Sequence, residues 1–160
     1  MSAFDVRRYR TLYFAYGSNM GEEELKHGKG CSSAFCLGNG YLVHRKLVFN
    51  KRSDKWGRSA NIIESYGDNV YGVLYDIPKQ EEWEKLDRTE TGYKRIHVRV
   101  RMLPGRKIVE AMTYEALSEY ITEEGQINKD YITLLINGAH AHRLPADYIK
   151  YLESIPTGEL

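Results

Sequence analysis

The sequence is poor in cysteine, a residue that defines several classes of small protein. Its 160 residues contain two, Cys31 and Cys36, which lie five positions apart. That spacing is neither a C-x-x-C redox pair nor half of a zinc-binding pattern, so it argues against a disulfide framework and against a zinc site. We expect two free thiols that pack in the core, which fits a cytoplasmic protein.

Long apolar segments and an excess of one charge are also missing. No window approaches 18 consecutive apolar residues, and the N-terminal residues lack the apolar stretch of a secretory signal, so neither membrane insertion nor secretion is expected. The 23 basic and 22 acidic residues leave a formal net charge of +1. Such a balance argues against nucleic acid or an anionic membrane as the main partner.

The sequence is rich in tyrosine, with 13 residues of this type. Tyrosine combines an apolar ring with a polar tip, which suits the lining of a wet pocket or an interface, so a homodimer is permitted but not required. The length and the hydrophobic content of 42% predict one domain over residues 1–160 with a core that needs no disulfide or metal. Residues 1–10 are predicted to form an N-terminal arm.

The hydrophobic pattern predicts strands first and helices mainly at the end. Alternation of apolar and polar residues places side chains 41, 43, 45, 47 and 49 on one face of a strand, and turns are expected at 38–40 and 66–69. The predicted fold class is α+β, with a mixed, largely antiparallel sheet that can close into a barrel and helices packed outside. We expect strands at 12–16, 33–37, 41–49, 60–64, 70–77, 94–102 and 108–114, and helices at 20–26, 78–88, 128–141 and 146–154.

The segment from Leu12 to Met20 is the one around which the chain is organised. Its aromatic residues favour a strand, Gly17 and Ser18 break it, and Asn19 is a suitable N-cap for a helix, with Glu22 completing a capping box. Free backbone N–H groups at such a junction suit a carboxylate or a developing oxyanion. Many strand–turn–helix junctions bind nothing, so both interpretations stay open.

Glu90 is the most informative acidic residue. The helix before it places Trp83 and Leu86 on one side, and Glu90 continues that series seven residues after Trp83. A carboxylate therefore stands where the pattern calls for an apolar residue. An inward Glu90 would suit general acid/base catalysis, whereas a helix that has already ended would leave Glu90 in solvent. His140 and His142 do not share a helix face, and we expect solvated side chains there rather than metal ligands.

Several segments of the chain together resemble the γ-glutamylcyclotransferase (AIG2-like) family. The first is Tyr13-Phe14-Ala15-Tyr16-Gly17-Ser18-Asn19, and the second is Leu86-Asp87-Arg88-Thr89-Glu90 followed by Gly92-Tyr93. The similarity continues in Ala60-Asn61-Ile62, in residues 67–75, and in Asp130-Tyr131, Gly138-Ala139 and Leu144-Pro145 with Tyr148. These segments occur in the family's order and span residues 12–156.

This resemblance implies a γ-glutamylcyclotransferase-like barrel and a reaction. An L-γ-glutamyl amide, the small-molecule partner, would close on itself to 5-oxoproline and release a free amine, as in glutathione metabolism, without a metal or organic cofactor. The resemblance implies that Glu90 is the catalytic acid/base. It implies substrate binding by Tyr13, Phe14, Ala15, Tyr16, Gly17, Ser18, Asn19, Tyr93 and Tyr131.

Two matters stay open at this stage. A non-catalytic relative that keeps the fold as a binding or interaction domain would have a blocked pocket or an outward Glu90. Within the enzyme interpretation, the leaving amine could belong to an amino acid, a short peptide, a lysine side chain or a natural product such as an aminoglycoside. Residues 50–58, either a flap or a solvated loop, and residues 117–127 are expected to shape that side. Arg45, Arg52 and Arg58 either hold a substrate carboxylate or carry surface charge.

Overall fold

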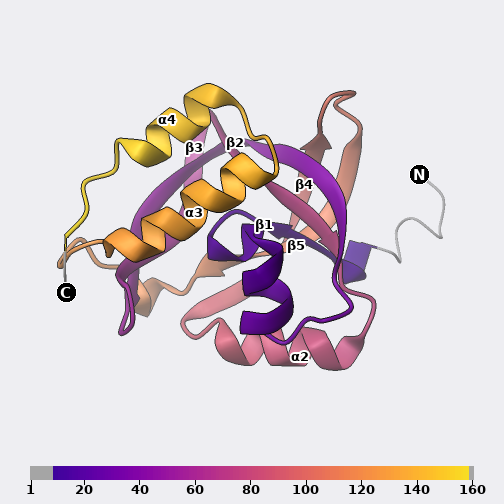
Figure 1. Ribbon diagram of the computed structural model, residues 1–160, viewed down its shortest axis with the longest axis horizontal. Coiled ribbons are helices and arrows are strands. Elements are labelled where there is room, and N and C mark those ends of the chain that lie inside the picture. The colour runs from indigo at the N-terminus through magenta and orange to yellow at the C-terminus, as the bar shows by residue number, and fades with distance from the viewer. Residues whose placement is uncertain (1–8, 159–160) are drawn as a thin grey trace.

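Five strands form a closed barrel in the computed structural model, which describes residues 9–158 (Figure 1). Their order around the barrel is β1-β3-β2-β4-β5, after which β5 returns to β1. Neighbouring strands are antiparallel except for β1 and β5, so the sheet is mixed. The strands are β1 Leu12–Ala15, β2 Phe35–Ser53, β3 Gly57–Asp76, β4 Tyr93–Met102 and β5 Ile108–Ala116.

The short strand β1 closes the barrel. It pairs with β3 along its whole length, while Tyr13 pairs with Met112 of β5 in the parallel direction. The Thr113 hydroxyl donates to the Phe14 carbonyl at 2.6 Å, which adds a buried side-chain bond to this brief junction. The predicted α+β class with a largely antiparallel barrel is therefore confirmed.

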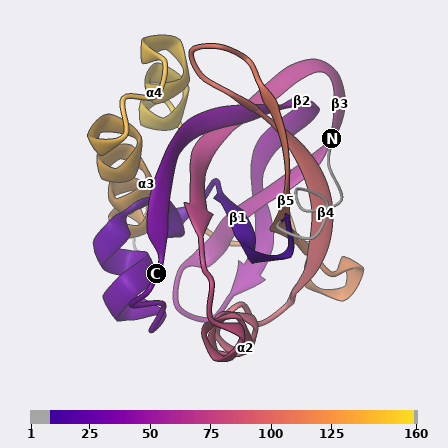
Figure 2. The same ribbon diagram turned by 90° about the vertical axis from the view of Figure 1, so that its right-hand side faces the viewer.

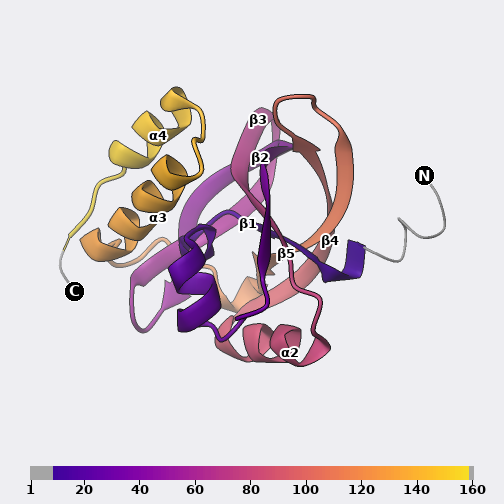
Figure 3. The same cartoon turned by 45° about the vertical axis from the view of Figure 1, so that its right-hand side comes forward.

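Helices cover one flank and one end of the barrel. Helices α3 and α4 lie together beside it, and α2 crosses beneath it (Figures 2 and 3). These helices span Gln80–Thr89 (α2), Lys129–Ala141 (α3) and Ala146–Glu153 (α4). Short 3-10 turns occupy Tyr9–Thr11, Ser18–Met20 and Ser118–Tyr120, and a π-helical turn occupies Glu24–Gly28. None of the described helices is long and apolar enough to cross a membrane.

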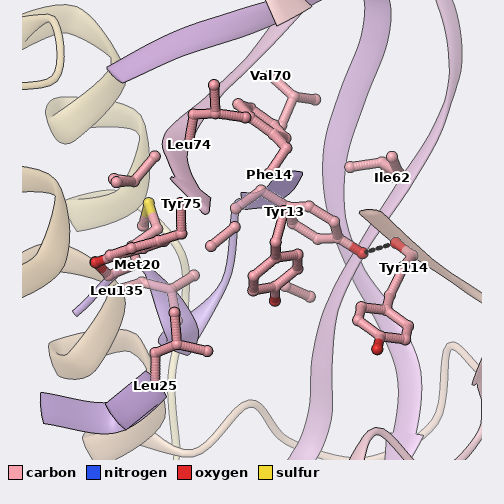
Figure 4. Packing of buried hydrophobic residues seen from close by; sticks show 14 of the residues in the cluster. Tyr13, Phe14, Met20, Leu25, Ile62, Val70, Leu74, Tyr75, Tyr114 and Leu135 are labelled. Atoms are coloured by element: carbon pink, nitrogen blue, oxygen red, sulfur yellow. Dashed lines mark hydrogen bonds between the residues drawn. The ribbon is translucent and has the colours of Figure 1, made fainter. Parts of the chain in front are cut away.

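The core continues from the barrel interior to the flanking helices (Figure 4). Met20, Leu25 and Leu135 are fully buried beside Tyr75, whose hydroxyl donates to the Met20 carbonyl at 2.6 Å. Burying large apolar side chains between layers stabilises a fold by about 1.5–3 kcal/mol for each side chain. This packing fixes the segment after β1 against α3, and so fixes the turn that contains Asn19.

The turns predicted at residues 38–40 and 66–69 are wrong, because β2 and β3 run through both segments. The glycine and asparagine residues there serve bulges in long, strongly curved strands rather than chain reversals. One bulge lies between Val43 and Arg45, where His44 has a φ of 57°. The bulge shifts the alternation of buried and exposed side chains by one residue. Leu42 is therefore buried in place of Tyr41 and Val43, and the prediction that side chains 41–49 share one face is wrong before the bulge.

Residues 50–58 form the tip of the β2–β3 hairpin rather than a loop. Strand β2 continues to Ser53, β3 begins at Gly57, and only residues 54–56 make the turn. The helix predicted at 20–26 is present but begins later and is irregular: a 3-10 turn covers Ser18–Met20, and a helical segment that becomes π-helical at Glu24 covers residues 22–28. Asn19 makes no capping bond, so the predicted capping box is wrong.

Both cysteines are free. Cys31 is buried, as predicted, whereas Cys36 is only half-buried and lies 3.8 Å from His142 Nδ1. Of the predicted N-terminal arm, residues 1–8 lie outside the described residues. Tyr9 belongs to a 3-10 turn, and its ring stacks on His97 with a centroid distance of 4.5 Å.

Candidate active site

A small cavity of about 40 Å³ lies where the end of β1, the end of α2 and the start of β4 meet. Residues from distant parts of the sequence build it, because barrel closure brings β1 beside β5 and β3. Five tyrosines contribute most of its side chains. The cavity is lined by Tyr13, Tyr16, Gly17, Ser18, Asn19, Ala60, Glu90, Tyr93, Tyr114 and Tyr131.

Glu90 enters this cavity from the C-terminal end of α2. Glu90 is the C-cap of α2, and its N–H donates the last helical hydrogen bond, to the Leu86 carbonyl at 2.9 Å. Gly92 then adopts a φ of +84°, a conformation that glycine tolerates, and the chain turns into β4. The Glu90 side chain is only 13% exposed. It therefore points inward, which was one of the two alternatives left open by the sequence.

Asn19 holds the Glu90 carboxylate. Its side-chain amide nitrogen donates to Glu90 Oε1 at 2.7 Å and to the Tyr13 hydroxyl at 3.0 Å. The Lys29 ammonium lies 3.8 Å from the same carboxylate oxygen. Asn19 is buried, and its own Oδ1 has no hydrogen-bond partner in the described structure. The amide thus ties the carboxylate at the end of α2 to the first strand of the barrel.

Two tyrosines form hydrogen bonds with the backbone of Ala60 on the opposite wall of the cavity. The Tyr93 hydroxyl donates to the Ala60 carbonyl at 2.6 Å, and the Tyr131 hydroxyl accepts a bond from the Ala60 N–H at 2.9 Å. Since the Tyr131 oxygen acts as an acceptor there, its own proton is left to donate into the cavity.

The tyrosines of this cavity stay protonated near neutral pH. Burial raises the pKa of Tyr13, Tyr16, Tyr93 and Tyr131 well above the usual value of 10.0, because a phenolate is poorly solvated away from water. They can therefore act as neutral donors but not as bases. Tyr16 already donates to the Tyr114 carbonyl at 2.6 Å, which fixes it in the wall.

A second, larger cavity of about 420 Å³ adjoins the first. Ser18, Glu90, Tyr93 and Tyr131 line both, so Glu90 stands at the boundary between an inner and an outer compartment. The outer wall comes from the β2–β3 hairpin tip and from Tyr120. The segments expected to shape this side, residues 50–58 and 117–127, thus both contribute to it.

The structure brings most of the candidate residues together. Tyr13, Tyr16, Gly17, Ser18, Asn19, Glu90, Tyr93 and Tyr131 all line the inner cavity. Phe14 and Ala15 do not, since both are fully buried in the core. Of the three arginines considered, Arg52 lines the outer cavity. Arg45 instead pairs with Glu115 at 3.0 Å, and Arg58 donates to the Phe49 carbonyl at 2.8 Å.

Several lining residues were not identified individually from the sequence, among them Tyr114, Lys29 and Lys51. Tyr114 reaches the cavity through the register of β4 and β5, which a single sequence does not reveal. Lys29 lies in the Gly28-Lys29-Gly30 segment, whose glycines indicate only a helix end. Lys51 lies in a polar stretch that is typical of a solvated loop, although it is buried.

Comparison with known proteins now places the chain in a family. The model of the AIG2-like family matches residues 69–152, just over half of the chain. Curated γ-glutamylcyclotransferases from mouse and cattle are 31% and 34% identical over 156 residues. The alignments cover 92% and 90% of this chain and 80% and 78% of those proteins.

The chain belongs to the γ-glutamylcyclotransferase (AIG2-like) family. A solved structure named γ-glutamyl cyclotransferase superposes with a TM-score of 0.83 at 26% identity. That match covers 93% of this chain and 89% of the other. The family relationship indicated by the sequence is thereby confirmed, and the barrel is that of γ-glutamylcyclotransferases.

Proposed function

We propose that this protein is a γ-glutamylcyclotransferase that converts an L-γ-glutamyl amide to 5-oxoproline and a free amine. One observation carries the proposal: a single carboxylate, Glu90, stands between a small tyrosine-lined cavity and a larger outer one. The inner cavity would take the γ-glutamyl group, and the outer one would take the leaving amine. The relatives that share this barrel carry the name of the same activity.

The reaction needs proton transfer more than it needs an external nucleophile. The α-amine of the substrate attacks its own γ-carbonyl carbon, and a C–N bond closes the five-membered ring. Glu90 accepts a proton from that amine and returns one to the leaving nitrogen as the original amide C–N bond breaks. The protons balance, and the carboxylate is regenerated. Holding nucleophile and carbonyl together in a folded conformer supplies much of the rate.

The developing oxyanion needs donors at a fixed position. Gly17 and Ser18 border the inner cavity at the start of a 3-10 turn, and their backbone N–H groups would serve this role. Tyr131 would donate its free proton to a carboxylate or carbonyl of the γ-glutamyl group. Asn19 would keep the Glu90 carboxylate in register with the amine.

A non-catalytic relative would have an outward or blocked Glu90. Here Glu90 is 13% exposed, faces open space on two sides and is oriented by an amide, which supports the catalytic interpretation. We therefore also propose that the biological partner is a small γ-glutamyl compound in the cytoplasm.

The test is a panel of γ-glutamyl compounds from which 5-oxoproline release is followed. The panel contains γ-glutamyl-alanine, γ-glutamyl-cysteine, γ-glutamyl-ε-lysine, glutathione and a γ-glutamyl aminoglycoside. We expect release from at least one compound and its loss in Glu90→Gln. Glu84→Gln, on an exposed position of the same helix, is the matched control. Silence across the panel and with γ-glutamyl-glutamate, from folded protein, would overturn the proposal.

A further inference from the structure

Cations dominate the outer cavity. Lys29, Lys51, Arg52 and Lys55 line it, against two carboxylates, Asp54 and Glu90. Lys29 lies 3.8 Å from Glu90, and the Lys55 ammonium lies 4.6 Å from the centroid of the Trp56 ring. Lys51, Arg52 and Lys55 form no ion pair with a carboxylate among residues 9–158, and Lys51 and Arg52 are the two that face the same Tyr120 ring.

Lys51 is unusual because a lysine is rarely buried without a carboxylate. The residue is 6% exposed, yet no described acidic group lies within salt-bridge distance of its ammonium. Tyrosine rings surround it instead, with centroids at 4.8 Å for Tyr93 and 5.3 Å for Tyr120. Burial lowers the pKa of Lys51, and the more distant carboxylates of Glu90 and Asp54 offset this only in part. An anion in the cavity would offset the rest of that desolvation cost.

The fold keeps Lys51 in this place. A Cβ atom at Gly92 would lie 2.8 Å from Lys51 Cε and 2.6 Å from the Tyr120 ring, so only a glycine leaves room for both. The same Tyr93 ring lines the inner cavity, which places the ammonium on the Glu90 side of the outer compartment.

Arg52 stands farther out. It is exposed, and its guanidinium lies 4.9 Å from the centroid of the same Tyr120 ring that Lys51 faces. Two cations thus share one aromatic ring, one at depth and one at the rim. A guanidinium in this setting is well suited to a bidentate bond with a carboxylate.

We propose that the outer cavity selects a leaving amine with two carboxylates, one bound by Lys51 and the other by Arg52. The leaving group is then an acidic amino acid or a short acidic peptide. This inference rests on the proposed function, because it assigns the outer cavity to the leaving amine. A polycationic leaving group such as an aminoglycoside would be repelled, and a neutral amine would leave both cations uncompensated.

The test compares γ-glutamyl compounds whose leaving amines carry none, one or two carboxylates. These are γ-glutamyl-ethylamide, γ-glutamyl-glutamine and γ-glutamyl-glutamate, and the last two are nearly isosteric. We expect kcat/KM to rise along the series, with γ-glutamyl-glutamate preferred over γ-glutamyl-glutamine by about tenfold, as for one charge-assisted bond. The preference should shrink at high salt, because the rim arginine is exposed.

Two variants separate the two cations. Arg52→Gln should bring the glutamate-to-glutamine ratio close to 1. Lys51→Met keeps the aliphatic stem, and it should lower kcat/KM for γ-glutamyl-glutamine more than for γ-glutamyl-ethylamide. Lys107→Met removes an exposed lysine outside both cavities and should leave the ranking unchanged. Melting curves establish that each variant is folded.

The outcomes distinguish this inference from the proposed function. Turnover of γ-glutamyl-ethylamide that depends on Glu90 reports the reaction alone, since this compound has no leaving-group carboxylate. Equal kcat/KM values for the glutamate and glutamine compounds, unchanged in Arg52→Gln, would overturn the inference and leave the reaction standing. If nothing is turned over, calorimetry on the Glu90→Gln protein decides: tighter binding of γ-glutamyl-glutamate that is lost in Arg52→Gln supports the inference, and equal or absent binding overturns it.

Discussion

The side-chain amide of Asn19 donates to the Glu90 carboxylate at 2.7 Å, although the two residues are 71 positions apart. Asn19 follows β1, whereas Glu90 ends α2, so this bond fixes two elements that meet only after the barrel closes. The same amide nitrogen also donates to Tyr13, which gives the carboxylate one orientation relative to β1. A proton-transfer residue needs such an orientation to be held before the substrate arrives.

Asn19→Ala should lower kcat while the protein remains folded. Loss of the amide leaves the Glu90 carboxylate free to adopt other rotamers, and small misplacements of a reacting group reduce rates by as much as about 100-fold. Steady-state kinetics on the most active γ-glutamyl compound measures the effect. Asn137→Ala, at an exposed position of α3, is the control. Unchanged kcat in Asn19→Ala would show that the bond has no role in catalysis.

Tyr131→Phe should destabilise the protein as well as impair it. The variant leaves the buried Ala60 N–H without its 2.9 Å acceptor, and an unsatisfied buried amide costs about 1–3 kcal/mol. Chemical denaturation gives the change in unfolding free energy. Tyr66→Phe, at a side chain that is 93% exposed, should change it very little. Equal stability of the two variants would contradict a stabilising role for the hydrogen bond between Tyr131 and the Ala60 N–H.

Gly72→Ala should be among the more damaging glycine substitutions in the barrel. A Cβ atom there would lie 2.4 Å from the Ala15 carbonyl oxygen and 2.7 Å from the Phe14 ring, so β1 would have to move. Overpacking of this kind typically costs about 1–3 kcal/mol. The matched variant Gly105→Ala has nothing within 4 Å and should be nearly neutral. Thermal melting of both variants provides the comparison.

Glu82 should make the free energy of unfolding depend on pH. Burial alone would raise its pKa, but hydrogen bonds from Ser33 and Ser32 outweigh this and lower the pKa of Glu82 below its usual value of 4.5. A carboxyl group whose pKa is lower in the folded state than in the unfolded state stabilises the fold at pH values above its unfolded-state pKa. This stabilisation is lost as the pH falls through the folded-state pKa. We expect wild-type unfolding free energy to fall below about pH 4.5 more steeply than that of Glu82→Gln. Parallel curves would contradict this.

Local patterns predict the elements whose stabilising contacts are local. The strands expected at 94–102 and 108–114 and the helix expected at 128–141 all correspond to observed elements. The helical spacing left the direction of Glu90 open, and the structure resolves it in favour of the inward position. The long strands β2 and β3 were missed in part, because glycine and asparagine mark both turns and bulges, and only the pairing register distinguishes them.

A site residue was predictable where its own chemistry indicates its role. It was not predictable where the role depends on a partner that is distant in the sequence. Asn19 has the local signature of a helix cap, yet its amide is used by Glu90 and Tyr13. Lys51 lies in a polar segment, and its burial depends on Gly92 and Tyr120, which the sequence does not place beside it. Long-range contacts of this kind appear only when the barrel is closed.

The most direct test of the account is the rate of 5-oxoproline release from γ-glutamyl-alanine, or from the most active member of the panel, by wild type, Glu90→Gln and Glu84→Gln. General acid/base catalysis contributes about 100- to 10,000-fold, so Glu90→Gln should lose at least the lower figure with its melting temperature preserved. Glu84→Gln should retain full activity. A folded Glu90→Gln protein with wild-type turnover would contradict the central claim that this carboxylate moves the protons.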